Sequence, residues 1–364
     1  MKTRAIINLA AIAHNLSVIR TLAPDSNIIA IVKADAYGHG VVSLLPTLEQ
    51  HAQALAIARI EEAQILRTAG YAGRILLLAG VSDETELSAA ILLKLDILVH
   101  DHAHLALLSH FNYRAQHKTT LWLKMDTGMH RLGFAPQDYA NAFQIIKKLP
   151  WCEKIIGMTH FSSADEPDKQ KTTQQIACYQ QHTANIALDN HSLANSAGII
   201  AWPAARRGWL RPGLMMYGIN PIGNSELNLK SELNLKPVMQ LEAQVIGTKT
   251  IAVGETTGYN EQWRAERETH IAFIAAGYAD GYPVTAINKS VVAINGERAP
   301  IIGRVSMDTI AIDCTAFATP AIGDWVELWG NTISVSEVAK AAGSIPYALL
   351  TSVSQRVKRI LISL

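Results

Sequence analysis

The sequence of 364 residues predicts an α/β chain with two domains. An N-terminal (β/α)8 barrel, similar to a TIM barrel, is expected over residues 1–236 and a mainly antiparallel β domain over residues 237–364. In the first part, short apolar segments alternate with segments of helical periodicity, and eight such repeats at this length are typical of a (β/α)8 barrel. A doubly wound open sheet is the alternative that the same alternation allows.

The first helix and strand of the predicted barrel have the clearest signals. Asn8 can cap a helix that ends before Pro24, since proline interrupts helical backbone. Its apolar face carries Ile12, Leu16, Ile19 and Ala23, at helical spacing. Residues 28–32 are continuously apolar and mostly β-branched, which is typical of a strand buried on both faces of a parallel sheet.

Seven further segments have the character of strands and are separated by helical patterns. They are residues 54–58, 74–79, 96–100, 120–125, 155–160, 191–195 and 213–217. Together with residues 28–32 they give the eight strands that the predicted barrel needs.

The segments after residue 236 predict the β domain. Residues 237–253, 269–276, 289–313 and 324–328 are rich in β-branched residues and are punctuated by turns. Before them the hexapeptide SELNLK occurs twice in succession, at 225–230 and 231–236. Two copies are too few for a solenoid, so the repeat is interpreted as a duplicated surface loop near the domain junction.

Composition indicates a globular protein without the net charge that would attract it to membranes or nucleic acid. Hydrophobic residues make up 49% and charged residues 17% of the chain, and the formal net charge is +1. The N-terminus lacks the pattern of a signal peptide, and no apolar run is long enough to cross a bilayer. The three cysteines lack metal-ligand spacing, and no metal site is expected. We therefore expect a soluble cytoplasmic protein.

Polar residues stand where the predicted strands end, which is where (β/α)8 barrels carry their reactive groups. They are Lys33, Lys124, Asp126, His160, Asn195, Ser196 and Arg211, the last just before the predicted eighth strand. Lys33 is the sharpest of these signals, because it follows five apolar residues and precedes a segment with glycines on both sides of His39. A lysine that merely enters solvent is the ordinary alternative. A partly desolvated lysine instead has a lowered pKa and becomes a nucleophile toward an aldehyde.

Four segments resemble those of a known enzyme family. IVKADAYGHG resembles the lysine signature of alanine racemases, which are fold-type III enzymes dependent on pyridoxal 5'-phosphate (PLP), and LKMDTGMHRLGF, RPGLMMYG and GRVSMD resemble three further segments in the same order. The similarity extends over nearly the whole chain. The SELNLK duplication departs from the family pattern, as do Gly258 and Asn260 on either side of Tyr259.

The resemblance implies a catalytic pair and a shared site. Lys33 is expected to bind PLP covalently and to exchange the α-proton on the D-face, and Tyr259 is expected to serve the opposite face. Racemisation needs two such acid–base groups on opposite sides of a planar carbon. In the family the tyrosine comes from the partner subunit, so the resemblance implies a homodimer in which the β domain completes the partner's active site.

The resemblance also implies how cofactor and substrate are held. Arg211 would face the pyridine nitrogen and His160 would stack on the ring. Phosphate contacts would come from Tyr37, Asn195, Ser196, Gly213, Leu214 and Tyr347. Arg131 and the Met307 N–H would hold the substrate carboxylate. Lys124 matches a lysine that is carboxylated in many members, a modification that would turn a cation into an anion able to pair with Arg131.

The activity so implied is alanine racemisation that supplies D-alanine for peptidoglycan. A serine or broad-specificity racemase would share these motifs. A decarboxylase of the same fold is disfavoured by Arg211, because an acidic residue is expected at that position in such enzymes. A non-catalytic PLP carrier would resemble the barrel alone, and the presence of Tyr259 and Met307 counts against it.

Overall fold

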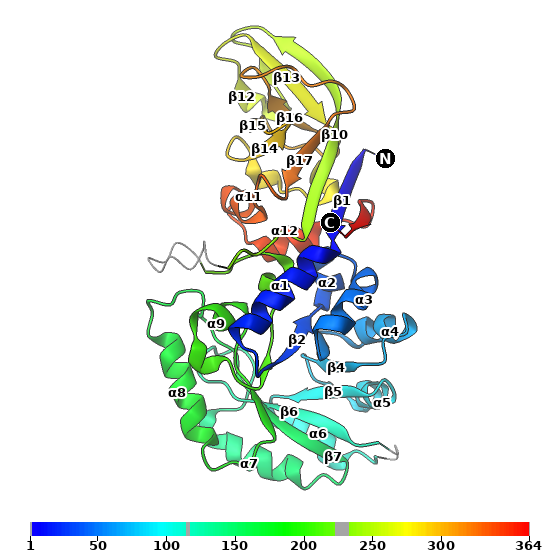
Figure 1. Ribbon diagram of the computed structural model, residues 1–364, viewed down its shortest axis with the longest axis vertical. Helices are drawn as coiled ribbons and strands as arrows, with labels where there is room; N and C mark the ends of the chain where they lie inside the picture. Colours follow the sequence, from blue (N-terminus) through cyan, green and yellow to red (C-terminus); the bar gives the residue numbers. More distant parts are fainter. Residues whose placement is uncertain (1, 114–116, 223–232, 364) are drawn as a thin grey trace. The chain divides into compact units, whose positions relative to one another are not determined.

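The computed structural model describes residues 2–113, 117–222 and 233–363, so most of the SELNLK repeat lies outside the described residues. The chain divides into two compact units (Figure 1). The barrel unit comprises Ile12–Ala36 and Val41–Lys236, and the β unit comprises Met1–Ala11, Tyr37–Gly40 and Pro237–Leu364. The sequence predicts a single boundary between residues 236 and 237, whereas the second unit also contains Met1–Ala11 and Tyr37–Gly40.

The barrel unit contains an eight-stranded parallel sheet. Its strands are β2 (Asn27–Ile31), β3 (Ala54–Ile57), β4 (Arg74–Leu77), β5 (Leu95–Val99), β6 (Thr119–Lys124), β7 (Cys152–Met158), β8 (Asn190–Ser192) and β9 (Trp209–Leu210). Their order is β8-β7-β6-β5-β4-β3-β2-β9, and every neighbouring pair is parallel. A parallel bridge between Asn195 and Arg211, just beyond β8 and β9, brings the two edges together. The sheet is therefore nearly closed, which confirms the barrel and excludes the open sheet.

Helices follow the strands on the outside of the barrel (Figure 1). They are α1 (Leu9–Leu22), which begins in the β unit, α2 (Lys33–Gly38), α3 (Val41–His51), α4 (Ile60–Thr68), α5 (Glu84–Leu92), α6 (His102–His110), α7 (Pro136–Lys147), α8 (Lys171–Thr183) and α9 (Ser196–Ala201). The side chains of Asp83 and Asp101 cap α5 and α6 by accepting the N–H groups of Glu86 and His104. The central strands are buried on both faces, as the apolar runs predicted.

The predicted eighth strand is wrong in position. Residues 213–217 form no strand; Leu214–Tyr217 is a 3-10 helix, η2, and the eighth strand is β9, four residues earlier. The Met216 N–H donates to the Gly213 carbonyl and closes a turn, and Gly218, with a φ of 87°, ends it. A short apolar run does not distinguish a strand from a buried turn of helix. Arg211 accordingly follows the last strand instead of preceding it.

Helix α2 is left-handed. Ala34, Asp35, Ala36 and Tyr37 have φ values of 53°, 53°, 54° and 51°. This conformation costs an L-residue roughly 1–2 kcal/mol, so surrounding contacts must hold it. Among them, the Ala34 N–H donates to Glu62 Oε1 at 2.6 Å. The segment that follows Lys33 is thus shaped by residues far from it in the sequence.

The β unit contains a closed antiparallel sheet. Its strands are β10 (Met239–Ile251), β13 (Thr269–Ile274), β14 (Val291–Ile294), β15 (Glu297–Ile302), β16 (Ile310–Asp313) and β17 (Trp325–Trp329). They pair in the order β13-β16-β15-β14-β17-β10, and β10 also pairs with β13, which closes the ring. The mainly antiparallel character predicted for this region is confirmed.

Two terminal strands extend this sheet beyond the ring. β1 (Thr3–Asn8) pairs antiparallel with β10, and β18 (Lys358–Ile362) pairs parallel with β1. The remaining elements are β11 (Thr256–Thr257), β12 (Trp263–Arg264), α11 (Val335–Ala341), α12 (Pro346–Ser352) and the 3-10 helices η1 (Pro203–Ala205), η3 (Tyr259–Glu261), η4 (Tyr278–Asp280) and η5 (Val284–Ala286).

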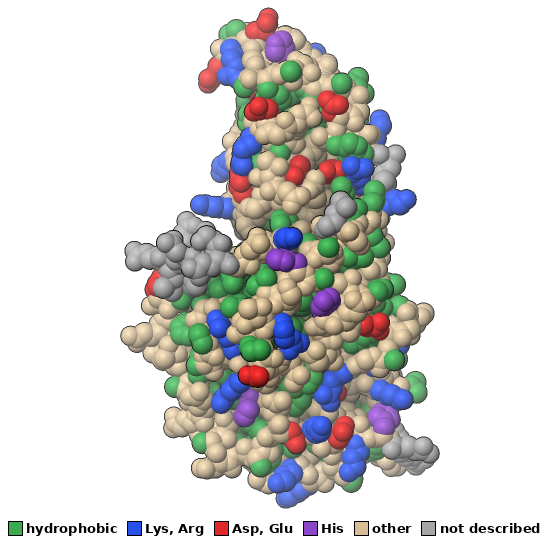
Figure 2. Space-filling model, viewed as in Figure 1, with side chains coloured by type: hydrophobic (Ala, Val, Ile, Leu, Met, Phe, Trp, Pro, Cys, Tyr) green, Lys and Arg blue, Asp and Glu red, His purple; other side chains and the backbone are tan. Residues whose placement is uncertain are grey.

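The distribution of charged side chains on the surface agrees with the low net charge of the sequence. On the face drawn in Figure 2, cationic and anionic side chains are interspersed, as a net charge of +1 leads one to expect. None of the helices in the described part of the chain is long and apolar enough to cross a membrane.

Candidate active site

The carboxyl ends of the barrel strands bring four cationic side chains close to one histidine. Lys33 begins α2 and is separated from β2 by one residue, Lys124 ends β6, and Arg211 directly follows β9. Burial lowers the pKa of His160 well below its usual range, and the charges of Arg211, Lys124, Arg131 and Lys33 lower it further. The charges of these four residues therefore act on His160.

Arg211 is the most deeply held of these cations. Its Nη1 donates to Ser192 Oγ at 2.6 Å, and its Nη2 donates to the carbonyl oxygens of Thr159 and Leu193 at 2.7 and 3.1 Å. Burial lowers its pKa to about 9, which leaves the guanidinium charged at neutral pH. These acceptors are all neutral, and no carboxylate pairs with Arg211 among the described residues. The site thus presents a buried, fixed positive charge that is free of a counter-ion.

His160 is held in one tautomer by the same arginine. Arg211 Nη2 donates to His160 Nδ1 at 3.2 Å. Because an arginine has no acceptor atom, Nδ1 must carry a lone pair and the proton of the neutral ring lies on Nε2. The lowered pKa keeps the imidazole uncharged. An uncharged ring fixed in this way can lie flat against an aromatic cofactor.

Lys33 lies between an anion and a cation. Burial lowers its pKa, Arg131 lowers it further, and Glu62 opposes the change. The Glu62 carboxylate also accepts the N–H groups of Ala34 and Ala58 at 2.6 and 2.7 Å, so it fixes the backbone beside the lysine. A lowered pKa raises the fraction of neutral amine, which is the nucleophilic form. No sequence motif had indicated that Glu62 contacts the backbone next to Lys33.

Lys124 is buried among like charges. Burial lowers its pKa to about 8, and Arg211, Arg131 and Lys33 contribute in the same direction, against Asp126. With little water around it, an unmodified ammonium here interacts unfavourably with the other cations.

Asp126 shapes the loop that carries Arg131. Its Oδ1 accepts the N–H groups of Gly128, Met129 and His130 at 2.9–3.0 Å. Burial raises its pKa, but these backbone bonds outweigh burial and leave the pKa lowered, so the carboxylate stays charged. The sequence placed Asp126 at a strand end without assigning this role.

Ser196 and the segment after Arg211 form a second polar group. Ser196 Oγ accepts the N–H groups of Gly213 and Met215 at 2.9 and 3.2 Å. Between them, the Leu214 N–H donates to no acceptor in the described part of the barrel unit. Asn195 Oδ1 accepts the Gly198 N–H and caps α9. Backbone N–H groups and a hydroxyl gathered at a helix start are suited to an anion such as phosphate.

The β unit carries the other four predicted residues. Tyr37 and Tyr347 meet edge to face with ring centroids 5.6 Å apart, and burial, with Tyr347 nearby, raises the pKa of Tyr37. Tyr259 on η3 and Met307 after β15 are instead 66% and 52% exposed. The Tyr259 hydroxyl makes no hydrogen bond within the residues that the structure describes. These two side chains are therefore available to another molecule.

The chain matches two family models that together span it. Residues 7–221 match the alanine racemase N-terminal domain and residues 238–361 match the alanine racemase C-terminal domain. The chain belongs to the alanine racemase family. It is thus by family an isomerase that depends on PLP, and the fold, enzyme class and cofactor expected from the resemblance are confirmed.

Relatives and solved structures agree with this assignment. The chain is 38% identical to the alanine racemase of Shewanella woodyi over 355 residues and 41% identical to the catabolic alanine racemase of Pseudomonas putida over 353 residues, with 97% of each chain covered in both cases. The biosynthetic alanine racemase of Pseudomonas aeruginosa superimposes with a TM-score of 0.94 at 39% identity, covering 99% of both chains. The alanine racemase of Bartonella henselae, solved with covalently bound pyridoxal phosphate, gives 0.88 at 30% identity, covering 100% of both chains.

Proposed function

We propose that this alanine racemase family member interconverts L- and D-alanine with PLP bound at Lys33, and that it acts as a cytoplasmic homodimer supplying D-alanine for peptidoglycan. The observation that carries the proposal is Arg211, a buried guanidinium with only neutral acceptors. The residues around it fit PLP, because the Lys33 amine, the uncharged His160 ring and the Leu214 N–H, which has no acceptor among the described residues of the barrel unit, stand near strand ends. Residues 237–364 would complete the site of the partner subunit.

Bound PLP withdraws electrons from the substrate Cα and so permits loss of its proton. Arg211 controls the extent of this withdrawal. A fixed cation beside the nitrogen of a bound pyridine ring would disfavour protonation of that nitrogen, since like charges repel. Arg211 would thereby keep the electron withdrawal weak and restrain reactions other than proton exchange. His160, held by Arg211, would support the face of the ring.

The phosphate would be held by groups that carry no net charge. Its oxygens would accept from the Leu214 N–H and the Ser196 hydroxyl, with Gly213 beside them and Asn195 fixing the start of α9; the Gly213 N–H itself donates to Ser196 Oγ. Tyr37 and Tyr347 would add hydroxyl donors. A raised pKa keeps the Tyr37 hydroxyl protonated and therefore able to donate.

Two groups would move the proton. Lys33 Nζ would serve the D-face, and its lowered pKa favours the amine form that can accept a proton. The Tyr259 Oη of the other subunit would serve the opposite face. The exposure of Tyr259 and Met307 supports this arrangement, because a second subunit would cover them. Arg131 and the Met307 N–H would hold the substrate carboxylate.

Lys124 would be carboxylated on Nζ. A pKa of about 8 makes the neutral amine accessible, and it is the neutral amine that reacts with carbon dioxide. The product would be a carbamate anion close to Arg131 and Arg211. It would replace the Lys124 ammonium, which these arginines repel, by a group that can pair with them.

Production of D-alanine from L-alanine by PLP-loaded protein tests the activity. Initial rates on L-alanine should exceed those on L-serine; equal rates would indicate a broad-specificity racemase. Absence of α-proton exchange with solvent deuterium for every amino acid tested would contradict racemisation.

Mixing two inactive variants tests the shared site. Lys33→Ala and Tyr259→Ala homodimers should each be inactive. After subunits are exchanged, each heterodimer would contain one site with both groups intact, so about a quarter of the wild-type activity should return. Failure to recover activity in proven heterodimers would show that the two groups belong to one subunit.

A further inference from the structure

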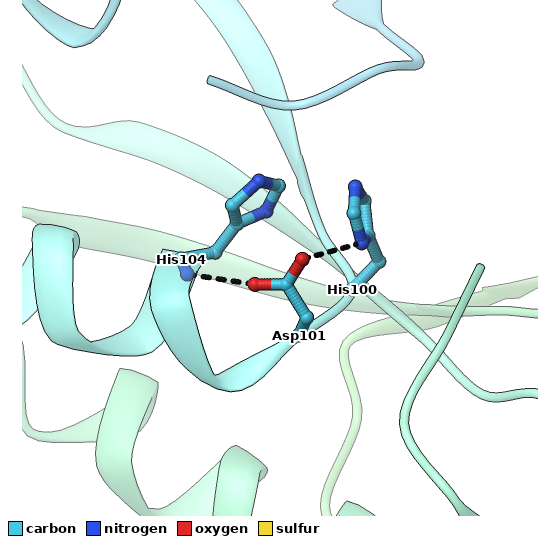
Figure 3. A group of neighbouring side chains, drawn as sticks. All are labelled: His100, Asp101 and His104. Atoms are coloured by element: carbon cyan, nitrogen blue, oxygen red, sulfur yellow. Dashed lines mark hydrogen bonds and ion pairs between the residues drawn. The ribbon is translucent and has the colours of Figure 1, made fainter. Parts of the chain in front are cut away.

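A separate polar cluster lies in the barrel unit where β5 ends and α6 begins. It consists of His100, Asp101 and His104, whose donor atoms all lie within 4.8 Å of one another (Figure 3). The proposed racemase chemistry uses none of these residues. We propose that the three side chains bind a divalent transition-metal ion of the zinc class.

His100 holds one ring nitrogen on the backbone and turns the other toward a carboxylate. Nε2 lies 3.1 Å from the carbonyl oxygen of Ala79, which can only accept, so Nε2 carries a proton. Nδ1 lies 3.1 Å from Asp101 Oδ2. A positive charge between these two atoms makes the contact favourable, and either a second ring proton or a metal ion bound by both supplies it. Metal-binding histidines typically donate their second N–H to a backbone carbonyl, as His100 does.

His104 supplies a second imidazole whose Nδ1 lacks a partner. The residue is only 8% exposed, and Nδ1 has no hydrogen bond within the described part of the chain. The ring also has a hydrogen bond to the backbone of Leu98, which leaves Nδ1 as the nitrogen available to a metal. The two rings lie 4.2 Å apart, centroid to centroid. Gly80 leaves room for this ring, because a Cβ there would collide with His104 Cε1.

The spacing and the donor types fit zinc. Ligand atoms on a tetrahedral zinc ion lie about 3.3 Å apart, given metal–ligand distances near 2.0–2.1 Å. The His100–Asp101 distance of 3.1 Å is close to this value, and a separation within 4.8 Å lets His104 reach the ion by side-chain rotation. Two imidazoles with one carboxylate suit zinc better than magnesium or calcium, which prefer oxygen. The Asp101 side chain is 47% exposed, which gives an ion and a bound water access.

Zinc titration of the untagged, PLP-loaded enzyme tests the site. After dialysis against a chelator, calorimetry in a buffer without phosphate should show one zinc ion bound per chain at this cluster. Asp101→Asn retains the side-chain oxygen that caps α6 but lacks the negative charge, and it should weaken this binding at least about tenfold. His104→Ala should weaken it similarly. His102→Ala is the matched control, because His102 lies on the same turn and its side chain is 67% exposed.

Cobalt absorption identifies the ligands independently of affinity. Cobalt(II) bound by imidazole and carboxylate should give visible d–d bands that Asp101→Asn and His104→Ala reduce and His102→Ala retains. Equal zinc binding by wild type and both cluster variants, or no binding by a wild type of native circular dichroism, would overturn the proposal. A thiolate charge-transfer band would also overturn it, since the ion would then lie at a cysteine.

Discussion

Replacing Lys124 by methionine should stabilise the protein in buffer depleted of carbon dioxide. The lysine is 5% exposed, and burial, with Arg211 and Arg131 adding to it, lowers its pKa from 10.5 to about 8. A lysine whose pKa is lower in the folded chain than in the unfolded chain destabilises the folded state at every pH at which the lysine is protonated in the folded chain. The cost is therefore complete below pH 8 and disappears as the pH rises to 10.5. It amounts to about 3 kcal/mol, at about 1.4 kcal/mol for each pH unit.

Urea unfolding of wild type and Lys124→Met measures this difference. At pH 7 the variant should have the larger free energy of unfolding by about 3 kcal/mol, and the gap should narrow above pH 8. Lys148→Met is the matched control, because Lys148 is an exposed lysine just after α7, and it should change little. Added bicarbonate should stabilise the wild type and leave Lys124→Met unchanged, since only the wild type can be carboxylated there.

The reasoning would be refuted by equal stability of the two proteins at pH 7 without carbon dioxide, together with no response of the wild type to bicarbonate. That result would mean that the ammonium is compensated inside the folded barrel. A carbamate signal after incubation with carbon-13 bicarbonate, present in wild type and absent from Lys124→Met, would identify the modified atom directly.

Three further substitutions test other parts of the molecule. Lys33→Ala should abolish turnover and leave borohydride-treated protein without a pyridoxyl adduct in the peptide containing position 33; an adduct elsewhere in that peptide would contradict the assignment. Tyr259→Phe should retain the visible PLP absorption but lower kcat by about 10²–10⁴-fold, with deuterium exchange surviving for one enantiomer only. Gly38→Ala should lower the free energy of unfolding by about 1–3 kcal/mol in thermal melts, because φ is 76° and the new Cβ would meet the Leu350 carbonyl oxygen; unchanged melting would argue against this close approach.

Much of the barrel was predictable because its signals are local. A strand buried on both faces needs a continuous apolar segment, and residues 28–32 have one regardless of the rest of the chain. The apolar segment at 213–217 carries the same signal, yet it forms η2, because Gly213 and Gly218 bound a turn there. The eighth strand is identified by the pairing of β9 with β2. Such a pairing cannot be predicted from the residues of 209–210 or of 213–217 alone.

In the candidate site, too, some residues could be predicted from the sequence and others could not. Lys33 and Arg211 stand at strand ends and lie within motifs, so sequence alone indicated them. Glu62 and Asp126 act through hydrogen bonds to backbone N–H groups, and those groups converge only after the loops have folded. Nothing in the composition near Glu62 relates it to Ala34, which precedes it by 28 residues. The left-handed turn of α2 was equally inaccessible, because alanine has no intrinsic preference for that conformation.

The pairing of β1 with β10 and β18 affects how the protein can be made. Thr3–Asn8 precedes the barrel in the sequence, but its two neighbours in the sheet, β10 and β18, both follow the barrel. The parallel sheet of the barrel can form on the ribosome while this first strand remains unpaired. A nascent chain that stops before Lys358 would leave one side of β1 open, and an open strand edge invites pairing with other chains. Translation that stops just before β18 should therefore yield aggregation-prone protein, even though Lys33 and Tyr259 have already been translated.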